Sequence, residues 1–298
     1  WEAASHAAGG ACALAEALLG GEAGVGFSAA RPPGHHANRD TTSGFCLLNS
    51  VAVAARHALD ALDARRVLVI DWDVHHGNGT NDIFRTTDSV LYASIHQGNL
   101  FPGTGHPYET GKGAGRGLSV NVPLEPFTED DSYLEAFDTV VPTALRAFRP
   151  DVILLQAGAD PHRFDPLADL SLTLTGMRAA YERVVALADE LTGGRIVATG
   201  GGGYDPYRTV PRAWAQLWSA LTGRELPAEL PAEWQAEWRS RLPEAPIPRR
   251  ATDGPEEFEP HPKREQVARR NRVVAGRTLE ALRAIWQDTG LTSGVTSS

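Results

Sequence analysis

The sequence predicts a single three-layer α/β/α domain with a mostly parallel central sheet. Short apolar runs alternate along the chain with longer segments of helical periodicity, which is the pattern of repeated strand–helix units. Most of these runs are continuously apolar, as expected for strands that are buried on both faces. At 298 residues, with 42% hydrophobic and 22% charged residues, the chain can bury a sizeable core and has an ordinary globular composition.

The individual elements follow from periodicity and from glycines. Good helix formers with apolar spacing fill residues 2–19, and Gly20 ends that segment. Acidic residues open the segment 129–148, where the helix dipole favours them. We expect further helices at 50–62, 173–191, 208–221 and 263–286, and strands at 25–28, 67–70, 90–96, 118–122, 152–157 and 196–199.

Some expectations concern single residues and one long segment. Thr80 is expected to cap the helix after the central strand. Trp214 and Trp218, one helical turn apart, are expected in the core. Residues 223–262 are rich in Pro, Glu and Trp, which indicates a peripheral and partly irregular segment.

Charge and cysteine content argue against several classes of protein. A formal net charge of −9 argues against general binding to nucleic acid or to an anionic membrane surface. The sequence has no apolar run of 18 residues, and we expect no signal peptide. Cys12 and Cys46 form no CxxC pair, so we expect a reduced, cytoplasmic protein without disulfides. We expect no direct nucleic-acid or membrane partner, and the sequence does not indicate an oligomeric state.

Residues 67–80 are the centre of the predicted site. An apolar, mostly β-branched strand runs directly into Asp71, Asp73 and His75, and glycines follow. Side chains alternate along a strand, so these three project to one side at its carboxyl end, where α/β sheets bind ligands. Burying several ionisable groups there is costly without pairing or a metal. Oxygen and nitrogen donors without a thiolate indicate Zn²⁺ or another first-row divalent ion in an open, catalytic site.

Three other predicted strands are followed by polar side chains that can take part in catalysis or ligand binding. His35 and His36 follow a Pro-Pro-Gly turn, and adjacent histidines in such a loop are acid–base candidates. Asp160 lies just beyond the strand 152–157. Tyr204 comes after four glycines, which let the backbone approach a ligand closely. The sequence therefore offers four strand ends from which one site can be assembled.

Six motifs occur in a characteristic order within residues 8–222. They are RPPGHHA (31–37), SGFC (43–46), DWDVHHGNGT (71–80), FPGTG (101–105), AGADPHRFDPL (157–167) and GGGGY (200–204). With these motifs the sequence resembles the zinc-dependent deacetylases, which comprise histone deacetylases, acetylpolyamine amidohydrolases and bacterial acetoin-utilisation proteins. The first and third motifs look like the class II branch, whereas residues 200–214 look like the acetoin-utilisation proteins.

The resemblance implies a domain organisation. Residues 1–222 would form the deacetylase-like catalytic domain, and residues 223–298 would be a peripheral segment and helix packed on the same domain. Family members normally carry a further N-terminal section that holds the first strand and one rim of the substrate channel. Because this chain begins at Trp1, we expect that section to be missing here.

The resemblance also implies residue roles. Asp73, His75 and Asp160 would be the ligands of Zn²⁺, with Fe²⁺ as an alternative ion. The implied catalytic residues are His35 and His36 beside the metal-bound water, Asp71 and Asn78 as their respective partners, and Tyr204 as the transition-state tyrosine.

Further implied residues line the substrate channel and bind potassium. The channel set is Gly44, Phe45, Phe101, Leu167 and Gly202. One K⁺ ion would be held by Asp71, Asp73, His75, Ser94 and Ile95, partly through backbone carbonyls, and a second by Phe84, Thr87 and Val90.

These residues account for amide hydrolysis. A metal can lower the pKa of water from 15.7 to about 7, and His36, whose partner is the neutral Asn78, would accept the proton. Tyr204 would stabilise the oxyanion together with the metal. We therefore predict a metal-dependent amidohydrolase that removes acetyl or other acyl groups from lysine side chains of proteins or from small acetylated amines.

The sequence leaves three alternatives open. An acetylpolyamine deacetylase is disfavoured slightly, because Leu167 gives the channel mouth no acid to attract a second amine. An arginase-type ureohydrolase has this architecture but needs two metals and more carboxylates. A non-catalytic acyl-ligand or protein-binding member, inactivated by the missing N-terminal section, is the third.

Overall fold

The central sheet contains six parallel strands in the order β1-β6-β5-β2-β3-β4. The structure, a computed structural model, describes residues 1–254 and 257–291. The strands are β1 (Val25–Ser28), β2 (Val67–Asp71), β3 (Val90–Gln97), β4 (Ser119–Leu124), β5 (Val152–Ala157) and β6 (Ile196–Gly200).

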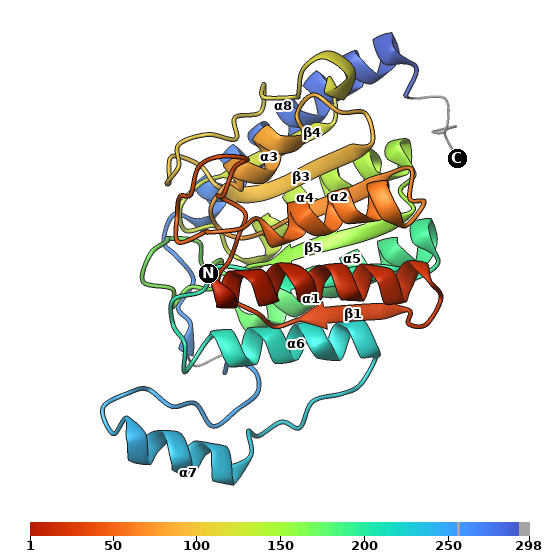
Figure 1. Ribbon diagram of the computed structural model, residues 1–298. Helices are drawn as coiled ribbons and strands as arrows, with labels where there is room; N and C mark the ends of the chain where they lie inside the picture. Colours follow the sequence, from red (N-terminus) through yellow and green to blue (C-terminus); the bar gives the residue numbers. More distant parts are fainter. Residues whose placement is uncertain (255–256, 292–298) are drawn as a thin grey trace.

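Helices cover both faces of this sheet, so the predicted three-layer α/β/α fold is confirmed (Figure 1). One layer contains α1 (Glu2–Leu19), α2 (Ser50–Ala61) and α3 (Asn78–Phe84). The other contains α4 (Asp130–Phe148), α5 (Leu174–Thr192), α6 (Val210–Thr222) and α8 (Arg264–Thr289).

The apolar strands bury side chains on both faces. In β2, Val67 and Val69 pack in the core that α1 and α2 share with the sheet. Leu68 and Ile70 pack in the larger core on the opposite face, among side chains of α4, α5 and α8. Alternation of side chains along a strand therefore explains why β2 is continuously apolar.

The C-terminal part of the chain adds two helices. α8 packs against α4 and β4, and the Nε1 of its Trp286 donates to the carbonyl of Gly117 at 2.9 Å. Within residues 223–262, which we expected to be partly irregular, the structure has α7 (Ala232–Arg241). The Trp238 ring of α7 lies 5.2 Å from the ring of Tyr207.

Two local predictions were wrong. Thr80 does not cap α3, because the helix begins earlier, at Asn78, with Gly77 as its N-cap. The Thr80 hydroxyl instead accepts a hydrogen bond from Asn49 Nδ2 at 3.0 Å. Trp218 is not in the core, since it is 45% exposed, whereas Trp214 is half-buried and its Nε1 donates to the Ala157 carbonyl at 3.0 Å.

The strand order fixes where a site can form. β2 and β5 are neighbours, but the chain continues from β2 toward β3 and β4, and from β5 toward β6. At such a reversal the connections leave in opposite directions, and the carboxyl ends of the strands border a crevice. None of the helices in residues 1–254 and 257–291 is long and apolar enough to cross a membrane.

Candidate active site

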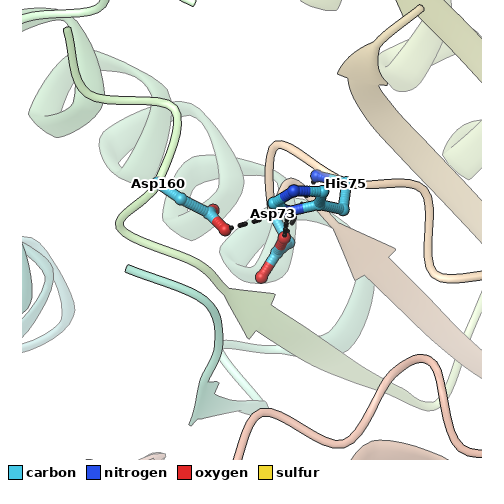
Figure 2. A group of neighbouring side chains, drawn as sticks. All are labelled: Asp73, His75 and Asp160. Carbon is cyan, nitrogen blue, oxygen red and sulfur yellow. Dashed lines mark hydrogen bonds and ion pairs between the residues drawn. The ribbon is translucent and has the colours of Figure 1, made fainter. Parts of the chain in front are cut away.

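Two carboxylates and one imidazole meet at the carboxyl ends of β2 and β5. Asp73 and His75 follow β2, and Asp160 follows β5 (Figure 2). One ligand atom from each lies within 4.8 Å of the others, and all three residues are buried. The Nδ1 of His75 is 3.2 Å from Asp73 Oδ1 and 3.2 Å from Asp160 Oδ2.

Backbone groups hold both carboxylates in place. Asp73 Oδ2 accepts a hydrogen bond from the Gly202 N–H at 2.5 Å, and Asp160 Oδ1 accepts one from the Val74 N–H at 3.0 Å. The approach of Gly202 is so close that a Cβ there would lie 2.0 Å from Asp160 Oδ2. A glycine is therefore required at this point of the run 200–203.

The electrostatics of the three side chains favour a cation. Burial and the charge of Asp73 raise the pKa of the Asp160 carboxyl to about 7. Burial alone would lower the pKa of His75, but its hydrogen bonds to Asp160 and Asp73 raise that pKa to about 10. The two carboxylates thus stabilise the protonated, positively charged form of His75, and they would stabilise a bound cation in the same way. A donor set of one imidazole nitrogen and two carboxylate oxygens fits Zn²⁺ with an open fourth position.

The adjacent histidines have different partners. His35 Nδ1 lies 2.9 Å from Asp71 Oδ2, and its Nε2 lies 3.6 Å from Asp73 Oδ1. His36 Nδ1 lies 2.8 Å from Asn78 Oδ1. Burial opposes protonation of His35, but the charges of Asp73 and Asp71 outweigh it and raise its pKa to about 9. Burial and the neighbouring His35 lower the pKa of His36 to about 3.

The peptide that joins Gly203 to Tyr204 is held by two side chains from other loops. The Tyr204 N–H donates to Asp165 Oδ2 at 2.7 Å, and Arg31 Nη1 donates to the Gly203 carbonyl at 2.8 Å. The Tyr204 ring lies 6.5 Å from the ring of His75. Burial and the charge of Asp73 raise the pKa of the Tyr204 hydroxyl, which therefore keeps its proton near neutral pH.

Two aromatic side chains lie next to His36 and Tyr204 on the solvent side of the site. Phe101 lies 5.1 Å from the His36 ring and Phe45 lies 5.7 Å from the Tyr204 ring, yet both are at least half exposed. Gly44 has a φ of +52°, and a Cβ there would lie 2.1 Å from His36 Cδ2. The exposed side chain of Leu167 follows Asp165 in the loop after β5.

A family model described as the histone deacetylase domain matches residues 1–221. The chain belongs to this family. Membership assigns it to the deacetylase-type hydrolases and confirms the resemblance seen in the motifs.

Individual relatives agree with this assignment. The acetoin utilization protein AcuC of Bacillus subtilis strain 168 is 40% identical over 292 residues, which cover 97% of this chain and 74% of the relative. A probable deacetylase of Archaeoglobus fulgidus is 40% identical over 220 residues, or 74% of this chain and 61% of that protein. The crystal structure of the HDA15 HD domain superimposes with a TM-score of 0.70 at 41% identity and covers 74% of this chain and 64% of that chain. This deacetylase-family chain thus spans less than two thirds of the latter two proteins.

The predicted channel residues differ in their exposure to solvent. Gly44, Phe45, Phe101 and Leu167 lie near the surface, at intermediate or exposed positions. Gly202 is buried and contacts the carboxylates of the candidate metal site directly.

The residues expected to bind potassium lie in two places. Asp71 and Ser94 are paired in the register of β2 and β3, and Ile95 follows in β3, beneath the candidate metal site. Phe84 ends α3, Thr87 lies in the following turn, and Val90 begins β3. The Phe84 carbonyl accepts the Thr87 N–H at 3.0 Å. Potassium binding stays a prediction for both sets.

The sequence did not single out several residues that support this site. The Tyr92 hydroxyl donates to Asp71 Oδ2 at 2.9 Å and accepts the Gly77 N–H at 3.0 Å. Arg31 and Asp165 hold the segment around Tyr204, as described above. Arg31 and Asp165 fall within matched motifs, which could have marked them. Tyr92 could be found only from the strand register.

Proposed function

We propose that this chain is a zinc-dependent amidohydrolase that removes acetyl groups from lysine side chains of proteins or from small acetylated amines. The observation that supports the proposal most is the placing of His36, with one nitrogen bonded to Asn78, beside the Asp73–His75–Asp160 group. Acyl-amide hydrolysis needs a water, a base that can take its proton, and a donor to the oxyanion. Each requirement has a candidate group here.

The hydrogen bond to Asn78 assigns the tautomer of His36. Because the amide oxygen of Asn78 accepts, Nδ1 of His36 carries the proton, and Nε2 has a free lone pair. Nε2 of His36 can then accept a proton from water and return it to the leaving amine. His35, held protonated by Asp71 and Asp73, contributes positive charge beside the reacting group.

Asp73, His75 and Asp160 would hold the ion. When bound there, Zn²⁺ would polarise the acyl carbonyl and lower the pKa of water to about 7. The hydroxyl of Tyr204 keeps its proton and would donate to the oxyanion. Phe45 and Phe101 offer apolar surface to an alkyl chain such as the lysine stem.

Tyr204→Phe is expected to lower kcat by about 10²–10³-fold, because one donor to the oxyanion is lost. Bound zinc should stay at the wild-type level, since the hydroxyl is not one of the three ligand groups. Steady-state kinetics and metal analysis of the same preparation measure both. Tyr207→Phe is the matched control, since that ring packs on Trp238 of α7. Near wild-type turnover of the Tyr204 variant would assign the oxyanion role elsewhere.

Asn78→Asp is expected to move the acidic limb of the kcat/KM profile to higher pH. A carboxylate on Nδ1 favours the imidazolium, so the low pKa of His36 rises and the base is lost at a higher pH than in the wild type. Asn99→Asp adds the same charge at an exposed position near Phe101 and should leave the limb in place. An unmoved limb in Asn78→Asp would argue against His36 as the base.

The substrate class is tested by one screen. The zinc-loaded chain is assayed on acetyl-lysine peptides and on acetylated polyamines at equal concentrations. We expect higher kcat/KM on the peptides, because Leu167 offers no charge to a second amine. A preference for the polyamines would favour the small-amine alternative, and no turnover of either would favour the non-catalytic one.

A further inference from the structure

A buried carboxylate from outside the matched family domain reaches the loop that carries Asp160. Asp253 lies beyond residues 1–221, yet its Oδ2 is 2.9 Å from His162 Nε2, and both side chains are at most 1% exposed. His162 lies two residues after the candidate ligand Asp160 and three before Asp165, which holds the Tyr204 backbone. His162 therefore lies between Asp160 and Asp165, the two residues through which this loop contributes to the candidate site.

The hydrogen bonds around His162 define its tautomer. Nδ1 accepts the N–H of Phe164 at 3.2 Å, so this nitrogen carries no proton. Nε2 therefore bears the proton and donates it to Asp253. The ring is fixed at both nitrogens: one closes the turn 162–164 of its own loop, and the other ties that turn to Asp253.

Asp253 is itself held from two other elements. Its Oδ2 also accepts the Leu174 N–H at the start of α5, at 2.7 Å, and its Oδ1 faces Arg212 Nη2 of α6 at 3.0 Å. Arg212 is fixed in turn by donating to the carbonyls of Arg208 and Thr252. A buried charge with this many partners cannot shift without leaving another buried group unpaired.

We propose that Asp253 is a positioning residue of the active site. By fixing His162 it sets the course of the loop 158–165, and thereby the placing of Asp160 at the metal and of Asp165 beneath Tyr204. The inference rests on the proposed function, because it assumes that Asp160 binds the metal. It also means that a segment beyond the matched domain takes part in forming the site.

The test compares zinc affinity and kinetics of variants made in the whole 298-residue chain. Asp253→Asn should raise the zinc Kd by about tenfold, the lower end of the range for outer-shell partners, as measured by competition with a chromophoric chelator. It should lower kcat more than it changes KM, because residues 158–165 carry Asp160 and the support of Tyr204, whereas the channel residues Phe45 and Phe101 lie on other loops. Asn271→Leu is the matched control. It removes another buried, hydrogen-bonded side chain of the C-terminal part, which contacts Thr128 and Ser132 far along the chain from the site.

A merely structural role would lower the melting temperature of both variants equally and leave both zinc affinities alike. That result would overturn the inference. A second pair keeps it testable if Asp253→Asn does not fold: His162→Gln retains an N–H donor of similar reach, whereas His162→Leu has none. We expect near wild-type zinc affinity for Gln and an affinity about tenfold weaker for Leu. Equal affinities in these two variants would contradict the proposal. If the wild-type chain binds no zinc or cleaves no acetyl amide, the proposed function fails instead.

Discussion

Asp160→Ala is expected to lose most of its zinc during dialysis and to show no measurable amide hydrolysis. Asp160 supplies one of only two carboxylates in the buried ligand group, and the remaining Asp73 and His75 cannot complete a three-residue site. Metal analysis after dialysis measures the first effect and an acetyl-lysine peptide assay the second. Added zinc should restore the chelator-treated wild type but not the variant.

A suitable control removes a different, partly buried acid that also accepts hydrogen bonds. Asp130 accepts hydrogen bonds from Thr173 at the start of α5 and is not part of the candidate metal group. Asp130→Ala should retain about one zinc per chain while losing a comparable number of hydrogen bonds. Full zinc retention by Asp160→Ala, or two tightly bound ions in the wild type, would contradict the single-ion model. The second result would instead favour a two-metal hydrolase.

His36→Ala is expected to lower kcat/KM by about 10²–10⁴-fold, the range for loss of a general base. The reason lies in the partners of the two histidines. His36 is neutral near pH 7 with Nε2 free, whereas His35 is held protonated between Asp71 and Asp73 and cannot accept a proton. Steady-state kinetics of zinc-loaded protein, with zinc content measured in parallel, separates loss of the base from loss of the metal.

His35→Ala is the matched comparison, because it removes the adjacent imidazole at the same site. It should cost less, since it removes electrostatic support rather than the base. A larger loss from His35→Ala than from His36→Ala would reverse the assignment of the two roles.

The sequence by itself determined the layered fold and the family. Periodicity located all six strands, and Gly20 and the acids of 129–148 located helix ends, because burial and capping are local requirements that leave a local pattern. The motifs at the ends of β2 and β5 likewise named the ligand candidates, since carboxylates that follow directly on buried strands need a partner.

Predictions from local sequence pattern were wrong for two residues whose environment is set by distant parts of the fold. Thr80 has the chemistry of a cap, but its hydroxyl pairs with Asn49, and Gly77 begins the helix. Trp218 has the spacing of a core residue, but α6 lies at the β1 edge of the sheet (Figure 1), and the Trp218 side chain is 45% exposed. The partner of Thr80 and the elements that α6 packs against are both distant in the sequence.

Only the tertiary structure decided how the groups of the site pair. The order β6-β5-β2 places three strand ends together, and no local pattern specifies strand order. The bond of Tyr92 to Asp71 and that of His162 to Asp253 join residues 21 and 91 positions apart. Such pairs arise because a buried polar group must find a partner, and the packed fold alone determines which group is within reach.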